Sequence, residues 1–143
     1  MARSECLWLD SDVLLDWLCD RQPWAAAADE LIDLALDGHC ELWLSALTLA
    51  NVFYIHRKQA GTAAALAELR TLTQLVRISA LDQTHVNQAL ASGRTDFEDE
   101  LQMASASGVI GLTTIITRNL GDYARGPVPA MTAEDWLRTR QDR

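Results

Sequence analysis

The sequence is short of lysine, cysteine and long apolar runs. The cysteine pattern and the absence of long apolar runs each argue against a class of protein. Its 143 residues include a single lysine, Lys58, and three cysteines, Cys6, Cys19 and Cys40. No apolar run approaches the ~18 residues that a membrane-spanning helix requires, so we expect no membrane association. The cysteines form no CxxC or Cys/His zinc pattern, which favours reduced, buried thiols over disulfides or a zinc site.

The charge balance narrows the range of partners. At pH 7 the formal net charge is −8, whereas a protein with a broad nucleic-acid-binding face is normally basic. This charge does not exclude a nuclease, because a metal ion can neutralise local carboxylates while a few arginines hold the substrate backbone. The acidity also suits a basic protein partner. Residues 1–5 lack the apolar stretch of a signal peptide, so we expect a cytoplasmic location.

Apolar segments of strand length alternate with helical patterns along the chain. The segments 6–9, 41–44, 76–78 and 113–117 read as strands, and 127–129 as a short edge strand or loop. Helical patterns fill the intervals, and the length suits one domain. The alternation predicts an α/β fold, a three-layer α/β/α sandwich with a mainly parallel central sheet, in a single domain spanning residues 1–143.

Four aspartates stand where predicted strands end or predicted helices begin. Asp10 follows the first strand, Asp122 follows the strand 113–117, and Asp96 and Asp99 open a helix. Taken singly, each has a simpler role as a helix cap, a turn residue or a partner of a helix dipole. Together they would meet at the carboxyl edge of a parallel sheet, where α/β proteins bind ligands. Oxygen-only clusters suit Mg²⁺ or Mn²⁺, so the sequence predicts metal-assisted chemistry on a phosphate.

The order of three motifs carries a resemblance to a known family. They are the segment 9–16, which contains Asp10, the Asp-Phe-Glu-Asp segment 96–99, and the Ile-Thr-Arg-Asn segment 116–119, followed by Asp122. In this order they resemble the PIN domain, a family of single-domain nucleases that includes many VapC-like toxins of bacterial toxin–antitoxin pairs. The resemblance covers nearly the whole chain.

The resemblance implies an activity, a cofactor and partners. A PIN domain of this kind is an endoribonuclease that uses Mg²⁺ or Mn²⁺ and metal-activated water to hydrolyse RNA phosphodiesters. It implies a homodimer and a cognate antitoxin that restrains the toxin. Carried over by position, Asp10, Asp99 and Asp122 are the catalytic, metal-holding acids, and Asp96 assists in holding the metal.

Two positions depart from the usual family pattern. Asp12 stands where the family usually has asparagine, and Asn51 stands where it usually has glutamate, which suggests a subgroup with asparagine in the second motif. An amide oxygen can bind a metal but brings no charge. We place Asp12 and Asn51 in a secondary set with three residues after the last strand. In this set Thr117 would orient Asp122 or a water, Arg118 would position a phosphate, and Asn119 completes the motif.

Three other interpretations stay open. A PIN fold weakened by Asn51 could bind RNA or a protein without cleaving. The segment around Asp10 and Asp12 also resembles the first motif of haloacid-dehalogenase-type phosphatases, in which one aspartate attacks phosphorus and the other acts as acid and base. That mechanism needs a lysine near the same edge, and Lys58 lies on a predicted helix in mid-chain. The third is an α/β domain of unrelated role.

Overall fold

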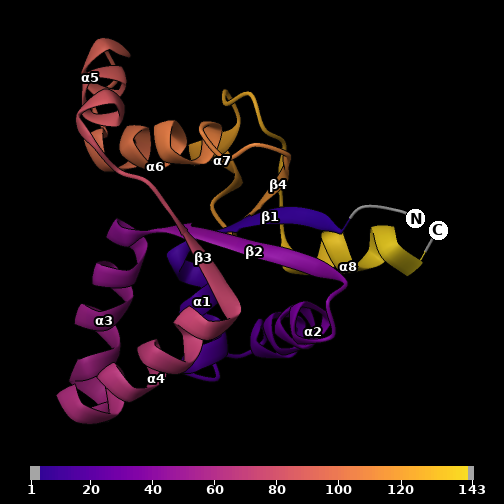
Figure 1. Ribbon diagram of the computed structural model, residues 1–143. Helices are drawn as coiled ribbons and strands as arrows, with labels where there is room; N and C mark the ends of the chain where they lie inside the picture. Colours follow the sequence, from indigo (N-terminus) through magenta and orange to yellow (C-terminus); the bar gives the residue numbers. More distant parts are fainter. Residues whose placement is uncertain (1–3, 142–143) are drawn as a thin grey trace.

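A parallel five-stranded sheet forms the centre of the molecule (Figure 1). The computed structural model describes residues 4–141, and the strands have the order β3-β2-β1-β4-β5 in the sheet. Their bounds are β1 (Glu5–Leu9), β2 (Cys40–Ser45), β3 (Val76–Ser79), β4 (Leu112–Ile116) and β5 (Ala130–Met131). Each pairing is parallel, as predicted. In central β1 Leu7, Trp8 and Leu9 are completely buried, because helices cover both faces of this strand.

Helices cover the two faces of the sheet unequally, giving the predicted α/β/α layers (Figure 1). One layer comprises α1 (Ser11–Leu18), α2 (Ala25–Leu36), α3 (Ala46–Ala60), α4 (Thr62–Leu75) and α8 (Ala133–Gln141). The main core lies under this layer and contains Leu31, Leu72 and Trp136. The other layer comprises α5 (Gln83–Ala91), α6 (Phe97–Ser107) and α7 (Leu120–Tyr123). A smaller cluster beneath it joins Trp8, Ala106 and Tyr123.

Local signals in the sequence explain several helix ends. The helix α2 ends at Leu36, shortly before Gly38, and Ser45 caps α3 by accepting the Thr48 N–H at 3.1 Å. Of the two possibilities that the sequence left open for residues 127–129, the structure has the loop, and the edge strand β5 follows it at Ala130–Met131. Pro129 has no N–H to give to a sheet and contributes only its carbonyl, which accepts from the Ile115 N–H at 2.9 Å.

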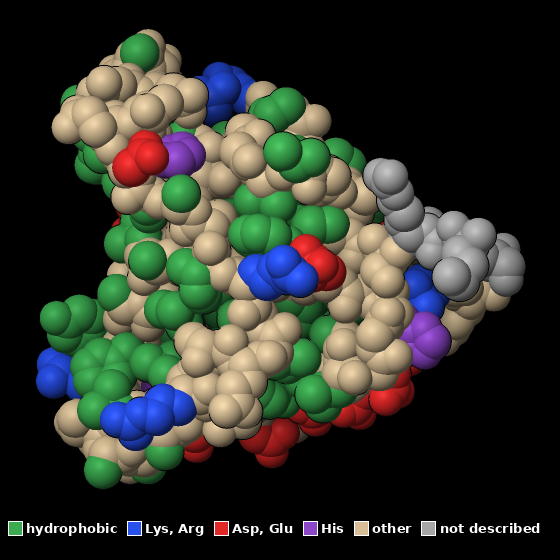
Figure 2. Space-filling model, viewed as in Figure 1, with side chains coloured by type: hydrophobic (Ala, Val, Ile, Leu, Met, Phe, Trp, Pro, Cys, Tyr) green, Lys and Arg blue, Asp and Glu red, His purple; other side chains and the backbone are tan. Residues whose placement is uncertain are grey.

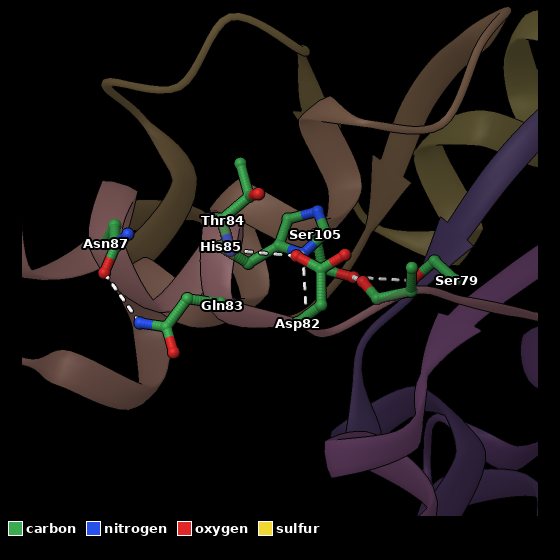
Figure 3. A network of polar contacts seen from close by, with 8 residues as sticks. Ser79, Asp82, Gln83, Thr84, His85, Asn87 and Ser105 are labelled. Carbon is green, nitrogen blue, oxygen red and sulfur yellow. Dashed lines mark hydrogen bonds and ion pairs between the residues drawn. The ribbon is translucent and has the colours of Figure 1, made fainter.

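Polar contacts across the sheet edge hold α6 in place. Gln102 is buried and accepts from Ser45 Oγ at 2.7 Å through its carbonyl, while its amide nitrogen donates to Thr48 Oγ1 at 2.9 Å. Further along α6, Ser105 Oγ lies 2.6 Å from Ser79 Oγ at the end of β3 (Figure 3). These contacts attach α6 to β2, α3 and β3, and so fix the position of its first turn.

His85 takes part in the capping box at the start of α5. Asp82 accepts the Thr84 N–H at 2.9 Å, and the Asp82 N–H donates to His85 Nδ1 at 3.1 Å (Figure 3). Each group satisfies an otherwise unpaired backbone N–H of the helix start. His85 therefore has a structural role at this helix end.

The three cysteines are free thiols, as predicted, and Cys6 and Cys40 are buried. Within residues 4–141 no helix is long and apolar enough to cross a membrane. The single domain of residues 1–143 stays a prediction, and residues 1–3 and 142–143 lie outside the part of the chain that the structure describes. On the face shown in Figure 2, acidic side chains gather along the lower edge, where Figure 1 places α2. That helix exposes Asp29, Glu30 and Asp33.

Candidate active site

Asp10 lies at the carboxyl edge of the sheet, where the chain leaves β1 and enters α1. Its backbone N–H continues the β1–β4 pairing by donating to the Ile116 carbonyl at 3.0 Å. One carboxylate oxygen caps α1 through the Ser11 N–H at 2.9 Å, and the other accepts from Thr117 Oγ1 at 2.8 Å. Thr117 is fully buried just past β4, so the neighbouring strand fixes the orientation of Asp10.

Asp99 is the acid at which the electrostatic effects of the site converge. It lies in the first turn of α6, and its N–H donates to Asp96 Oδ1 at 3.1 Å, so Asp96 is the helix cap. Burial first, and then the negative charges of Asp122, Asp96 and Asp10, together raise the pKa of the Asp99 carboxyl from 3.8 to about 6. The charges of three aspartates therefore act on the fourth, and we call these residues the acidic cluster: Asp10, Asp96, Asp99 and Asp122.

Asp12 borders the acidic cluster on α1. Its Oδ2 accepts the Arg118 N–H at 2.9 Å, whereas its Oδ1 is buried without a hydrogen-bond partner. Burial raises the pKa of the Asp12 carboxyl to about 6, with a further contribution from the charge of Asp10, and the contacts with Arg118 oppose the shift. An unsatisfied buried carboxylate oxygen is costly, so this atom is a natural position for a positive ligand.

The remaining secondary residues lie in two places. Asn119 is exposed at the start of α7, and its backbone N–H donates to Thr117 Oγ1 at 2.9 Å. The Thr117 hydroxyl therefore bonds Asp10 and the Asn119 N–H, and its orientation of Asp122 or of a water stays a prediction. Asn51 lies on α3, where its Nδ2 donates to Glu98 Oε1 of α6 at 2.6 Å.

Arg118 is engaged differently from its predicted role in positioning a phosphate. Its guanidinium donates to both carboxylate oxygens of Asp16, from Nε at 2.8 Å and from Nη2 at 2.9 Å. It also lies over the Trp24 ring, 3.8 Å from the ring centroid. Asp16 is only 2% exposed, so the ion pair ties the end of β4 to α1. The guanidinium is therefore part of the framework of the site.

Sequence reasoning missed two residues of this region. Tyr123 is buried beside the acidic cluster, and its pKa is raised by burial first and then by the charges of Asp10 and Asp99. Asp16 was missed as the partner of Arg118. A signal existed for Asp16, since it is an acid among the apolar residues of α1, but its partner is 102 positions away in the sequence.

The donor set of the acidic cluster is chemically suited to a hard divalent cation. All its side-chain donors are carboxylate oxygens, and Asp12 adds an unpartnered buried oxygen beside them. The mutual repulsion expressed at Asp99 is what a cation would relieve. Within residues 4–141, no three side chains of His, Cys, Asp or Glu form a ready-made metal-binding group, so a cation would have to draw the carboxylates closer.

Comparisons with known proteins place this geometry in context. The family model described as "PIN domain" matches residues 7–121. Among solved structures, the DNA-bound VapBC of Salmonella typhimurium aligns with a TM-score of 0.66 at 18% identity, covering 90% of this chain and 98% of that chain. VapC20 of Mycobacterium tuberculosis, described as a Sarcin-Ricin loop cleaving toxin, aligns with a TM-score of 0.65 at 15% identity, covering 84% and 95%.

A toxin–antitoxin complex from Klebsiella pneumoniae aligns with a TM-score of 0.65 at 21% identity, covering 89% of this chain and 97% of that chain. At these identities the structural similarity establishes a shared fold and nothing further. No curated protein matches the sequence.

Proposed function

The chain belongs to the PIN-domain family, and we propose that it is a Mg²⁺- or Mn²⁺-dependent endoribonuclease that acts as the toxin of a toxin–antitoxin pair. The observation that carries the proposal is the environment of Asp99, whose pKa is raised by burial and by the charges of Asp122, Asp96 and Asp10. Carboxylates from three separate segments therefore act on one point. Repulsion between these carboxylates costs stability when no cation is bound. Perturbed carboxylates of this kind are typical of functional sites.

Asp10, Asp99 and Asp122 would hold the metal, and Asp96 would assist. When bound, the ion would polarise the phosphodiester and lower the pKa of a water that attacks phosphorus. The protein's own part is to orient the carboxylates. The Ser11 N–H and the Thr117 hydroxyl fix the two oxygens of Asp10. In the metal-free protein the pKa of Asp99 is raised to about 6, and a bound cation would favour the ionised carboxylate that holds it.

The secondary residues would act through these acids. Asp12 and Arg118 hold the turn between β4 and α7, because the Arg118 N–H is bound to Asp12 Oδ2. That turn carries Asn119 and leads into Asp122. Asn51, on α3, reaches the acidic helix α6 through Glu98. The proposal assigns these residues to positioning, with no covalent part in the reaction.

An antitoxin partner is part of the same proposal. The Salmonella and Klebsiella neighbours are complexes of toxin and antitoxin by their descriptions. On this chain, an apolar cavity of about 490 Å³ lies between α1, α2 and α4, and a second of about 450 Å³ shares its residues Trp17 and Thr71. Beside it α2 exposes acidic side chains. We expect a small partner whose apolar side chains fill the cavity and whose neighbouring side chains are basic. The net negative charge of this chain would attract such a partner.

A homodimer is also proposed. Large apolar side chains are exposed on α3 and at the start of α6, where Tyr54 is 56% and Phe97 43% exposed. Burying them against a second copy would remove apolar surface from water. Light scattering on the purified chain should give twice the monomer mass of 15.8 kDa. A Tyr54→Ser variant should shift the population from the dimer toward the monomer.

Metal-dependent RNA cleavage is the test of the activity. The purified chain, incubated with labelled single-stranded and structured RNAs, should cleave with Mg²⁺ or Mn²⁺ and lose cleavage with EDTA. Asp99→Asn should abolish cleavage while the variant stays folded, with a thermal midpoint in EDTA at neutral pH no lower than that of the wild type. A matched control is Asp135→Asn, which also removes one acid but lies on α8 in an exposed ion pair with Arg138. An intact chain that binds RNA without cleaving it would favour the binding-module interpretation.

A further inference from the structure

Two layers of polar contacts join α3 to α6. The inner layer is the buried set in which Gln102 bonds Ser45 and Thr48. The outer layer lies about one turn toward the carboxyl end of α3 and one turn toward the amino end of α6. There Asn51 Nδ2 donates to Glu98 Oε1 at 2.6 Å. Moving outward from Gln102 to Glu98 leads toward the amino-terminal end of α6. The outer layer therefore lies in the turn that carries Asp96 and Asp99.

The Asn51–Glu98 contact determines which way each group faces. An ionised carboxylate only accepts hydrogen bonds, so the amide nitrogen of Asn51 must face Glu98 and its carbonyl oxygen must face away. Glu98 is exposed and adjacent in sequence to Asp99. Within the described residues it forms no ion pair with a basic side chain, whereas Glu100 of the same turn pairs with Arg94 at 3.2 Å. The charge of Glu98 is thus held in place and left uncompensated.

We propose that Glu98 is a further carboxylate of the acidic cluster and that Asn51 is its positioning residue. The contact carries a negative charge to the α3–α6 border of the site, although the residue on α3 is itself neutral. A divalent cation at the acidic cluster would bind the Glu98 carboxylate directly or through a bound water. The inference rests on the proposed function, because it assumes that the acidic cluster binds a divalent cation.

A Mn²⁺ binding experiment tests the assignment without reference to catalysis. Binding is measured as the loss of the electron paramagnetic resonance signal of free Mn²⁺. Glu98→Gln and Asn51→Ala should each weaken Mn²⁺ affinity by about tenfold or more, the usual effect of removing a group that orients a metal site. The matched control is Glu100→Gln, which removes the same charge from the same turn and should change the affinity less than about threefold.

An exchange variant separates positioning from a general structural effect. Asn51→Glu combined with Glu98→Gln reverses the contact, placing the carboxylate on α3 and the amide on α6. We expect this double variant to bind Mn²⁺ more tightly than Glu98→Gln alone. Circular dichroism should show that every variant compared is folded.

The outcomes distinguish this inference from the proposed function. Wild-type protein that is folded and binds no Mn²⁺ would overturn both. Wild-type protein that binds Mn²⁺, with Glu98→Gln binding as tightly, would overturn the inference and leave the metal site standing. Equal losses in Glu98→Gln and Glu100→Gln would also overturn it, because the effect would then be one of net charge alone.

Discussion

Arg118 and Asp16 form a bidentate ion pair that joins the end of β4 to the buried side of α1. The two N–O distances are 2.8 and 2.9 Å, and the Asp16 side chain is 2% exposed while that of Arg118 is 27% exposed. The backbone N–H of Arg118 bonds Asp12 at the same time. One residue therefore connects the framework of the fold to an acid beside the acidic cluster.

Arg118→Ala should destabilise the protein by about 3 kcal/mol, because it leaves the buried Asp16 carboxylate without its partner. Arg118→Lys should recover little of this loss, since an ammonium cannot form the two parallel bonds of a guanidinium. Urea unfolding measures the difference. Arg138→Ala is the control: its ion pair with Asp135 is exposed, and its removal should cost less than about 1 kcal/mol. An unchanged stability for Arg118→Ala, with weaker RNA binding, would instead assign the guanidinium to substrate.

Thr117→Val should loosen Asp10 without changing the charge of the site. The hydroxyl of Thr117 is fully buried, donates to Asp10 Oδ2 and accepts from the Asn119 N–H. Losing it should lower the free energy of unfolding by about 1–2 kcal/mol and weaken Mn²⁺ binding. Thr117→Ser, which keeps the hydroxyl, should restore metal binding. Tight Mn²⁺ binding by Thr117→Val would show that the hydroxyl does not orient the acid.

Gln102→Leu should separate α6 from α3. The substitution leaves the buried hydroxyls of Ser45 and Thr48 without the partners that they have at 2.7 and 2.9 Å. We expect a loss of about 2 kcal/mol in denaturant unfolding. Gln83→Leu is a useful comparison, because its amide bonds Asn87 on the exposed side of α5 and should matter little. Equal stability of the two variants would contradict this account of how α6 is held.

The raised pKa values of Asp12 and Asp99 predict a pH dependence of stability in metal-free protein. Both carboxyls move from 3.8 to about 6, so the folded state favours their protonated forms. Their contribution to stability is fully present below about pH 4 and is lost as the pH rises through about 6. Wild type should therefore lose stability relative to Asp99→Asn over this interval, as followed by thermal unfolding in EDTA.

Added Mn²⁺ should reverse that trend, because a cation favours the ionised carboxylates and so binds more tightly as the pH rises through 6. Parallel stability curves for wild type and Asp99→Asn from pH 4 to 7 would show that Asp99 is not in a repulsive environment.

Much of the fold could be predicted from local sequence patterns. The helix Ala25–Leu36 follows from its apolar spacing and from Gly38 beyond its end, and Ser45, Asp82 and Asp96 cap the helices that follow them. The edge strand could not be placed in this way. A two-residue strand such as Ala130–Met131 has almost no pattern of its own and exists because β4 offers it a partner.

The positions of the four aspartates could be predicted because each stands at a strand or helix end, where parallel topology gathers such positions, and their role in a metal site stays a prediction. Contacts between distant segments could not. The Arg118–Asp16 pair and the Asn51–Glu98 bond join residues 102 and 47 positions apart. Nothing in the spacing of either pair indicates that they meet, and so the contacts of Asp16 and Glu98 emerged only from the folded chain.

Calorimetric titration with Mn²⁺ of the wild type and of the double variant Asp10→Asn, Asp99→Asn tests the central claim most directly. Asp10 directly follows β1 and Asp99 lies on α6, and the account places them in one metal site. It predicts that the wild type binds Mn²⁺ and that the folded double variant shows no measurable binding. Absence of binding by the folded wild type, or equally tight binding by the double variant, would contradict it.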